Sequence, residues 1–567
     1  MAEGSARRRR HLPRMARPEA PAASTRPHPP PGAAMERRHF TAGLAALPFA
    51  GALPRRAQAA EKVLRVAMTA ADIPSTTGQP NQGAEGIRFM GITAYDALTA
   101  WDLSRGDIKA RLRPGLAERW ETDPADRTRW TFHLRRGVTF HDGSEFDAAA
   151  VVWNLDKVMN KAAPQFDSAQ AAQAATFVAP IASYRAVDGS TVEIVTREPN
   201  ATLPYKLVSV FMSSPARWRE LGGSWERFAL NPSGTGPWKV EKVAPRERVE
   251  FSRNAKYWEA ARIPRCDRMV IQPMPDALTR AAALLAGQVD WVEAPSPDII
   301  PRLRQAGMQI VTNPYPHVWP YLLSCLPDSP FKDVRVRQAI NLGIDREGLV
   351  ALLGGTAMAA TGVVPPNDPW FGTPRFQARH DPREAKRLLQ AAGYGPRNPC
   401  NATMLISTSG SGQMQPLPMN EAIKQGLEEV GINLRFEVLE WEALRGRRRS
   451  GAAAPENRGM HGLNNSLGSA EPSSIIDAIW SKRAPPVGLN WGWFNDPQMD
   501  ALAARCEVEF DPERQDMLLA ELHAGFVDQA LWAFIVHDLN PRALGPRLRG
   551  FVQAQSWSQD LTTVDIA

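Results

Sequence analysis

The sequence predicts an α/β protein with at least two lobes. Short apolar runs of the kind found in buried strands alternate along the chain with amphipathic segments of helical period. About 500 residues follow residue 60, which is more than a single hydrophobic core usually supports. We therefore expect at least two compact bodies, each built from helices and strands.

Individual elements in the first half of the chain follow from the periodicity of apolar residues. Pro275 and Asp276 begin a predicted helix that runs through Ala286 and ends at Gly287, a residue type that commonly follows the last turn. The predicted strands are residues 63–67, 192–195 and 249–252.

The second half of the chain repeats this alternation. After helices within residues 333–353, it predicts a helix at 381–393, a strand at 404–407, a helix at 420–430 and a strand at 432–439. This succession forms a second α/β unit.

One segment carries a more specific pattern. Trp130, Phe132 and Leu134 alternate with polar residues, as in a half-buried strand, and the alternation resumes at Val138. A turn then precedes Asp147, a good N-cap for an amphipathic helix. The local prediction is a hairpin, a turn and a helix.

Residues 130–157 resemble the signature segment of the extracytoplasmic solute-binding proteins of peptide/nickel-type (family 5) ABC importers. In that family an aromatic strand, a V-x-F-H-D-G turn and a helix-opening F-x-A-x-x-V occur in this order. Further blocks that resemble the family, in its order and at roughly its spacing, lie at residues 112–121, 234–238, 253–258, 276–290 and 331–346. The resemblance covers nearly everything after about residue 62 and is weakest between residues 445 and 490.

The resemblance implies a two-lobed periplasmic binding protein fold of type II, in the large cluster with an extra subdomain, with the ligand cleft between the lobes. Residues 60–315 would form the first part of lobe 1 with the subdomain, residues 316–489 lobe 2, and residues 490–567 the return to lobe 1.

The same resemblance implies a function. The protein would capture a peptide or peptide-sized organic solute by hinged lobe closure and deliver it to an ABC permease with its ATPase subunits. We expect a monomer without cofactor. A receptor that hands its ligand to a sensor, and an enzyme on the same fold, remain the alternatives.

Catalytic motifs are missing from the sequence, so an enzyme is not expected. It contains no G-x-S-x-G, no H-E-x-x-H and no Walker-type glycine loop. Ser329 and Lys332 meet S-x-x-K by spacing only, since Pro330 works against the helix that would bring them together. His133 and His141 are expected to be surface or hydrogen-bonded polar groups, and no metal is expected.

Candidate ligand-binding residues follow from the need of a ligand cleft for flat apolar walls and a few fixed polar groups. The loop after the first strand, two aromatic residues near the lobe junction, and an amide-rich loop followed by two tryptophans could supply them. The two tryptophans lie two apart, so on an extended segment they would share a face. For each aromatic residue, core packing is the alternative, and the amide residues could be ordinary loop residues. The candidates are Asp72, Trp319, Tyr321, Asn465, Ser466, Trp491 and Trp493.

One residue departs from the dipeptide-binding members of the family. They carry an aspartate that pairs with the free amino group of the ligand, and Gly468 occupies its position here. An ammonium group taken out of water without a partner is costly. A free dipeptide is therefore disfavoured, whereas longer peptides and other organic solutes stay open.

The formal charge of +7 belongs to the front of the chain. Residues 1–60 hold 11 Arg and 3 Glu, a net charge of +8, so the remainder carries −1 and no nucleic-acid partner is expected. We expect residues 1–34 to be a disordered extension, with translation starting at Met35.

Residues 35–59 are predicted to be a cleaved signal peptide. Arg37 and Arg38 precede a weakly apolar run at 41–53 and an Ala-x-Ala site at 57–59. The run is shorter than the roughly 20 residues that span a bilayer. The paired arginines favour twin-arginine export over general secretion, and the mature protein is expected to be soluble in the periplasm.

The four cysteines leave two possibilities open. None lies near the cleavage site, so no lipid-bearing cysteine begins the mature chain, and their wide spacing argues against zinc. Cys266, Cys325, Cys400 and Cys506 could pair in three complete ways or stay free thiols.

Overall fold

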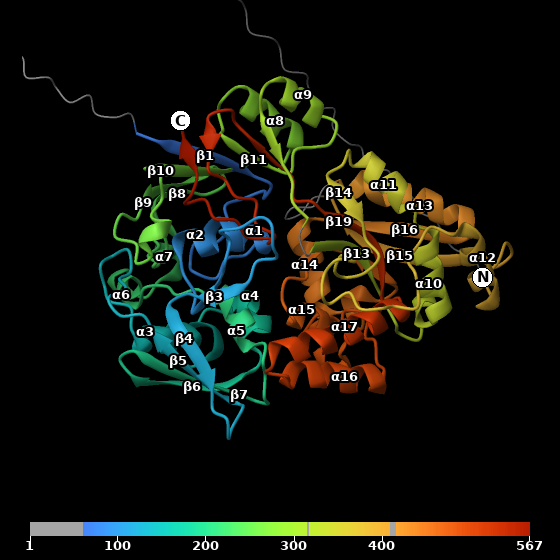
Figure 1. The fold of residues 1–567 in the computed structure, drawn as a ribbon, viewed down its shortest axis with the longest axis horizontal. Coiled ribbons are helices and arrows are strands. Elements are labelled where there is room, and N and C mark those ends of the chain that lie inside the picture. The colour runs from blue at the N-terminus through green and yellow to red at the C-terminus, as the bar shows by residue number, and fades with distance from the viewer. Residues whose placement is uncertain (1–60, 315–316, 409–414) are drawn as a thin grey trace, which may run out of the picture. The chain divides into compact units, whose positions relative to one another are not determined.

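Two seven-stranded sheets organise the protein in a computed structural model that describes residues 61–314, 317–408 and 415–567 (Figure 1). In the first, sheet 1, the central strand pairs in parallel with both neighbours, and the outer strands are antiparallel. Its strands in spatial order are β12 (Gln309–Val311), β20 (Arg542–Leu544), β11 (Trp291–Glu293), β1 (Val63–Met68), β10 (Arg268–Pro273), β9 (Arg248–Arg253) and β8 (Trp238–Ala244).

Helices and short strand pairs surround sheet 1. They are α1 (Ala84–Gly86), the π-helix η1 (Ile87–Gly91), α2 (Ile92–Ala94), α6 (Pro215–Glu220), α7 (Trp225–Leu230), α8 (Ala277–Leu285), α9 (Ile300–Gln305), and the pairs β2 (Thr99–Trp101) with β3 (Leu112–Pro114) and β21 (Leu548–Arg549) with β22 (Asp565–Ile566). The expected helix at 276–286 is confirmed as α8, because the Asp276 side chain accepts a hydrogen bond from the Thr279 amide at 2.7 Å.

The second seven-stranded sheet, sheet 2, has apolar clusters on both faces. Its strands are β14 (Ala357–Ala359), β19 (Trp532–Asp538), β13 (His317–Leu323), β17 (Gly462–Asn464), β15 (Cys400–Ser407) and β16 (Ile432–Leu439), with β18 (Leu467–Gly468) beside β13. Its helices are α10 (Val334–Gly343), α11 (Arg346–Leu352), α12 (Pro382–Ala391), α13 (Pro416–Val430), α14 (Trp441–Ser450), α15 (Ser473–Ile479), α16 (Pro497–Val508) and α17 (Pro512–Asp528).

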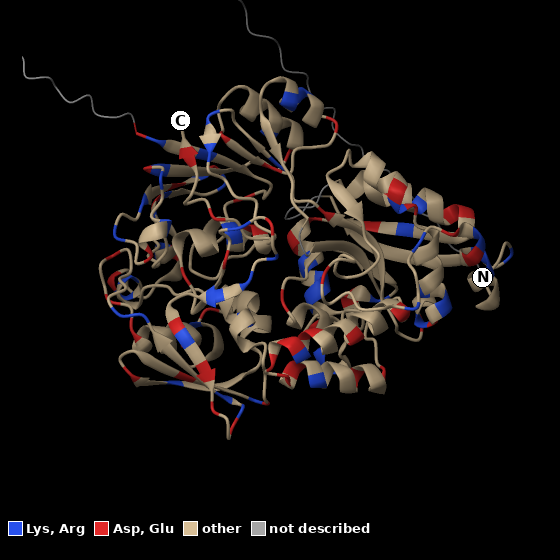
Figure 2. Cartoon of the chain, in the orientation of Figure 1, with Lys and Arg blue, Asp and Glu red and all other residues tan. Residues whose placement is uncertain are grey.

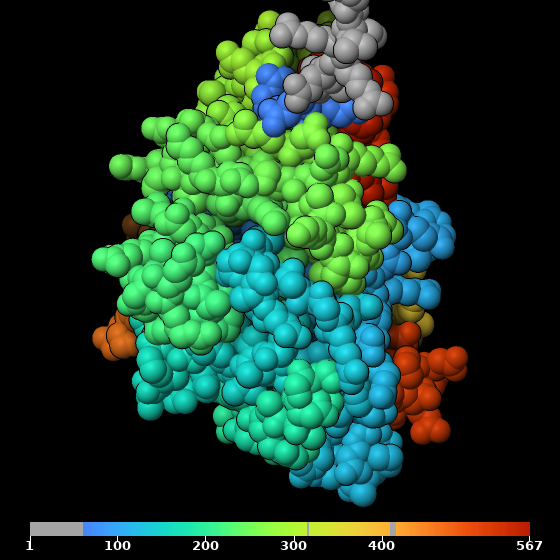
Figure 3. Space-filling model, turned by 90° about the vertical axis from the view of Figure 1, so that its left-hand side faces the viewer, coloured from blue at the N-terminus to red at the C-terminus, as the bar shows by residue number. Residues whose placement is uncertain are grey.

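A four-stranded antiparallel sheet, sheet 3, forms the extra subdomain. It consists of β4 (Ala117–Thr122), β5 (Arg129–Leu134), β7 (Thr191–Thr196) and β6 (Ile181–Asp188), with α3 (Ala148–Met159), α4 (Ser168–Val178) and α5 (Leu203–Lys206). In Figure 3 the segment that carries sheet 3 (cyan) and the segment that carries α6 and β9 (green) lie against each other on one face. Sheets 1 and 3 are called lobe 1 below, and sheet 2 with its helices is called lobe 2.

The pattern at residues 130–159 is confirmed in part. Trp130, Phe132 and Leu134 are buried on β5, and the Asp147 carboxylate caps α3 by accepting from the Ala150 amide at 2.8 Å. The predicted hairpin is wrong, because β5 pairs with β4 and β7 rather than with the segment around Val138. A periodic pattern identifies a strand but not its neighbours.

The chain returns to lobe 1 later than residue 490. Helices α16 and α17 pack against α15, and β19 pairs with β13 and β14 in sheet 2. Every residue of β19 is buried, since it fills the space between those two strands. Only β20 rejoins sheet 1, so residues 490–538 belong to lobe 2.

Acidic and basic residues are interspersed over both lobes (Figure 2). All four cysteines are free thiols, the second of the two alternatives. No helix within the described ranges is long and apolar enough to cross a membrane. The remaining short helical turns are η2 (Leu207–Ser209), η3 (Ala260–Arg262), η4 (Pro330–Lys332), η5 (Pro455–Asn457) and η6 (Ser481–Arg483).

Candidate functional site

A cleft lies between lobe 1 and lobe 2. It consists of two adjoining pockets with volumes of about 300 and 290 Å³, in the range found for small-molecule sites. Both lobes contribute to the part that the two pockets share, so a bound molecule would touch both. The shared lining residues are Gly83, Ile87, Phe177, Arg445 and Arg448.

Aromatic side chains form the walls of the larger pocket. Trp101 ends β2, Phe177 lies on α4, and Trp557 comes from the C-terminal segment of lobe 1. Trp441 begins α14 on the side of lobe 2. Flat apolar walls of this kind suit the apolar part of an organic solute.

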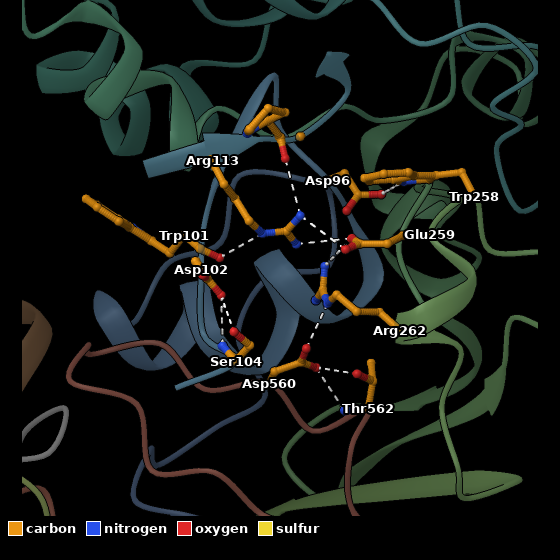
Figure 4. A network of polar contacts seen from close by, with 12 residues as sticks. Asp96, Trp101, Asp102, Ser104, Arg113, Trp258, Glu259, Arg262, Asp560 and Thr562 are labelled. Carbon is orange, nitrogen blue, oxygen red and sulfur yellow. Dashed lines mark hydrogen bonds and ion pairs between the residues drawn. The ribbon is translucent and has the colours of Figure 1, made fainter. Parts of the chain in front are cut away.

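A polar network holds the wall that carries Trp101 (Figure 4). The Arg113 guanidinium donates from Nε to the Trp101 carbonyl at 3.2 Å and from Nη2 to Glu259 at 3.1 Å. Arg262 pairs with the same Glu259 at 3.4 Å and donates to Asp560 at 2.7 Å. The network therefore fixes β2 against the C-terminal segment, which also carries Trp557.

This network lowers the pKa of the Asp560 carboxyl. Burial raises the pKa of the Asp560 carboxyl, but the Arg262 guanidinium and the hydrogen bonds from Thr562 outweigh burial, so the pKa is lowered overall. Asp560 is therefore ionised at neutral pH and keeps Arg262 in place.

Three arginines of α14 line the cleft on the side of lobe 2. Arg445 forms an ion pair with Glu442 at 2.9 Å. Arg448 and Arg449 form neither a hydrogen bond nor an ion pair through their side chains with the part of the chain that the structure describes, and Arg448 Nε is buried. Burial, followed by repulsion from Arg445 and Arg449, lowers the pKa of Arg448 to about 10.

The loop between β17 and α15 provides acceptors near these donors. Asn465 is 3% exposed and donates to the Ser466 carbonyl at 2.7 Å, while its own Oδ1 has no hydrogen-bond partner among the described residues. Glu471 is partly buried, and burial raises the pKa of its carboxyl to about 7. Gly468 lies between them on the pocket wall.

The structure places three of the predicted ligand residues on the cleft. Asn465 and Ser466 line the larger pocket, as expected, and their contact with a ligand stays a prediction. Trp491 lines the smaller pocket, but it is 1% exposed and packs mainly in the core of lobe 2.

The other four lie elsewhere. Trp319 and Tyr321 are fully buried in the core of lobe 2, so the expectation that they face the cleft is corrected. Asp72 accepts a hydrogen bond from the Arg246 amide at 2.8 Å, which directs it to the turn between β8 and β9. Trp493 is 42% exposed and does not line the cleft.

The predicted common face of Trp491 and Trp493 is wrong. Trp493 has φ of 58°, so the segment is not extended there, and the Trp491 side chain is buried whereas that of Trp493 is exposed. At Gly492, between the two tryptophans, the backbone of Leu323 approaches so closely that a Cβ would overlap the Leu323 carbonyl oxygen.

Several cleft residues were not among the sequence candidates. Trp101, Phe177, Trp441 and Trp557 are scattered over the chain, and nothing in their local sequence distinguishes them from core aromatics. The run that contains Arg445, Arg448 and Arg449 was a usable signal, because it puts like charges on one helix face.

The histidines named from the sequence have protein partners. His133 Nε2 lies 3.1 Å from Glu121, and His141 Nε2 lies 2.9 Å from the Gly236 carbonyl. Within residues 61–314, 317–408 and 415–567 no group of three or more His, Cys, Asp or Glu side chains is placed to hold a metal ion.

Known proteins resemble this chain over most of its length. Heme-binding protein A of Haemophilus influenzae is 26% identical over 81% of this chain and 84% of that protein. The dipeptide-binding protein of Escherichia coli is 26% identical over 77% of this chain and 83% of that protein.

Solved structures share the fold. The periplasmic binding protein DppA of Helicobacter pylori, solved in complex with the peptide STSA, has a TM-score of 0.75 at 21% identity, over 89% of this chain and 98% of that one. A dipeptide binding protein of Pseudoalteromonas, solved in complex with Met-Leu, has a TM-score of 0.75 at 20% identity, over 89% of this chain and 100% of that one.

The resemblance seen in the sequence blocks is thus supported by similar proteins and solved structures, and also by a family model. The family model described as bacterial extracellular solute-binding proteins, family 5 Middle, matches residues 111–484. This match covers more than half of the chain and includes both sheet 3 and most of sheet 2. The chain belongs to the family 5 bacterial extracellular solute-binding proteins.

Proposed function

We propose that this protein is the periplasmic substrate-binding protein of an ABC transporter. It captures a peptide or peptide-sized organic solute in the cleft and delivers it to the membrane permease, whose ATPase subunits supply the energy. The observation that carries the proposal is the cleft itself, which has aromatic walls from both lobes and buried polar atoms without protein partners. Relatives named for dipeptides and for glutathione support a solute of this size.

The topology supports hinged closure. The chain passes from lobe 1 to lobe 2 after β12 and returns after β19, so two connections join the lobes. A solute that contacts both walls would stabilise the closed arrangement, because opening breaks half of its contacts.

Two measurements on one sample test capture by closure. A solute at a hundredfold excess over Kd should stabilise the protein by about 2.7 kcal/mol and should reduce the radius of gyration in small-angle X-ray scattering. Native mass spectrometry of the purified protein identifies a candidate solute first. A solute that raises the melting temperature without changing the scattering curve would exclude closure.

Binding without chemical conversion is part of the proposal. The relatives are binding proteins, and the solute should be recovered unchanged after prolonged incubation with the protein. Conversion of the solute would favour the enzyme alternative. Loss of solute uptake in a strain that lacks the protein separates transport from sensing.

Export is proposed from residues outside the described ranges. Residues 35–59 would act as a twin-arginine signal peptide that is removed near Ala60, which leaves a soluble monomer. The double substitution Arg37→Lys and Arg38→Lys should retain the precursor in the cytoplasm. Normal periplasmic yield of that variant would indicate general secretion.

A further inference from the structure

We propose that the solute is an organic acid with at least two anionic groups, carboxylate or phosphoryl, that pair with Arg448 and Arg449. Its apolar body would lie against the aromatic walls of the cleft. This inference rests on the proposed function as a solute-binding protein and specifies the chemical class of the solute.

The arrangement of the arginines carries the inference. Arg448 and Arg449 lie three and four residues after Arg445 on α14, which puts them on the same helix face as Arg445. Glu442 neutralises Arg445 at 2.9 Å. Arg448 and Arg449 form no ion pair with the described residues, and Arg448 Nε has no hydrogen-bond partner there. The same Glu442 also attracts Arg449, so Arg445 and Arg449 share one nearby carboxylate.

The unpaired charge of Arg448, whose Nε is buried, needs an explanation, whereas Arg449 beside it is exposed. Like charges at this spacing repel each other, and a guanidinium removed from water without an acceptor destabilises the fold. Burial and the neighbouring arginines lower the pKa of Arg448 to about 10, as expected for a cation that lacks an anion. An anionic solute would supply the missing acceptors to both groups.

The position of these residues at the end of a helix is not a sufficient explanation. Basic residues are favoured in a last helical turn by the helix dipole. Arg447 has the same position but is satisfied by the protein, with Nη1 2.9 Å from Glu437 and Nε 2.5 Å from Asn457. An arginine in the last turn can thus be favoured by the helix dipole and still bond to the protein. The helix dipole therefore does not explain why Arg448 faces the cleft without an acceptor.

The other residues that line the cleft do not cancel this positive charge. Glu471 is the one acidic side chain among the described residues that line the cleft. Burial raises its pKa to about 7, so it is only partly ionised at neutral pH. Together with Asn465 Oδ1 it can accept a hydrogen bond from an amide or hydroxyl of the solute.

A matched set of probes tests the inference on the full chain. The set is N-acetyl-aspartyl-phenylalanine with two carboxylates, N-acetyl-asparaginyl-phenylalanine with one, its C-terminal amide with none, and N-acetyl-phosphoseryl-phenylalanine amide. Calorimetry at constant ionic strength should give affinities that rise by about tenfold per anionic group. Arg448→Gln and Arg449→Gln should each weaken binding of the dicarboxylate by about 10- to 100-fold.

The controls distinguish the site from general charge. Arg447→Gln removes one positive charge from the same helix and should leave the affinity for the dicarboxylate unchanged. Arg448→Lys keeps the charge and should retain binding better than Arg448→Gln. If Arg448→Gln does not fold, the order of affinities on the unmodified protein still decides.

The pH dependence of the affinity distinguishes a phosphoryl group from a carboxylate. A phosphoryl group loses its second proton near about pH 6, so the affinity of the phosphoryl probe should fall below that pH while that of the dicarboxylate persists. The preferred probe then shows which acid the solute carries.

Two results would overturn the inference. One is equal or tighter binding of the neutral amide, and the other is failure of every probe at millimolar concentration. A different result would overturn the proposed function itself. In that case no solute of any charge would change the melting temperature, and none would co-purify with the protein.

Discussion

Lys206 Nζ lies 2.8 Å from Asp477 Oδ2, and both side chains are less than one-tenth exposed. Lys206 ends α5 in lobe 1, whereas Asp477 lies on α15 in lobe 2. Arg483 approaches the same carboxylate at 3.3 Å and also pairs with Glu507. This buried ion cluster therefore joins the two lobes.

Removal of the lysine should weaken the fold considerably. Lys206→Ala leaves Asp477 buried with only part of its counter-charge, so we expect the free energy of unfolding to fall by about 3 kcal/mol. Urea unfolding measures this change. Lys482→Ala is the matched control, because its pair with Glu198 also joins the lobes but is about half exposed, and it should cost less than about 1 kcal/mol. Equal losses in both variants would contradict the role of burial.

Trp491 and Trp493 should respond differently to truncation. Trp491→Ala removes a fully buried indole from the core of lobe 2 and should lower the free energy of unfolding by about 3 to 5 kcal/mol. Trp493→Ala removes a side chain that is 42% exposed and should cost about 1 kcal/mol or less. Thermal and urea unfolding compare the two variants, and a large loss for Trp493→Ala with a small one for Trp491→Ala would show that their packing is assigned incorrectly.

Glu471 should make stability depend on pH near neutrality. Burial raises its pKa from 4.5 to about 7 in the folded protein, so the protonated form is favoured there. The resulting stabilisation is fully present below pH 4.5 and is lost as pH rises through about 7. Glu471→Gln stays neutral and should become more stable relative to the unmodified protein over this interval.

Urea unfolding at several pH values checks that sign. Glu384→Gln provides the control, because a hydrogen bond from Arg387 lowers the pKa of this partly exposed carboxyl, so it does not titrate in this pH interval. A constant stability difference between Glu471→Gln and the unmodified protein from acidic to neutral pH would exclude the raised pKa.

The four thiols should be protected in the folded protein. Burial raises the pKa of Cys266 to about 11 and that of Cys400 and Cys506 to about 12, so little reactive thiolate forms at pH 8 or below. Cys325 is partly exposed and should react first with a disulfide reagent. All four should react in denaturant without reductant, and a count below four would reveal a disulfide.

Local sequence patterns determined most of the individual elements. The N-caps Asp147, Asp276 and Asp381 begin α3, α8 and α12, because a short carboxylate accepts an amide that the first helical turn leaves free. The alternation in β5 and the apolar run of β1 were equally local. Such signals act within a few residues, so the sequence reports them directly. The blocks that resemble family 5 then implied the arrangement of the elements.

Sheet membership was decided by tertiary structure. β19 was expected in lobe 1 and lies in lobe 2, because its fully buried strand pairs with β13 and β14. A run of apolar residues shows that a strand is buried but does not name the strands that cover it.

The composition of the cleft was also a tertiary result. Trp319 and Trp441 are both aromatic residues of lobe 2, yet only Trp441 lines the cleft. Arg447 and Arg448 are neighbours on α14, but Arg447 turns to Glu437 while Arg448 points into the cleft. The run from Arg445 to Arg449 makes the end of α14 strongly basic whatever lies around it, and this much the sequence by itself determined. Which of its charges find a protein partner depends on residues distant in the chain, because an ion pair requires two groups to meet in space.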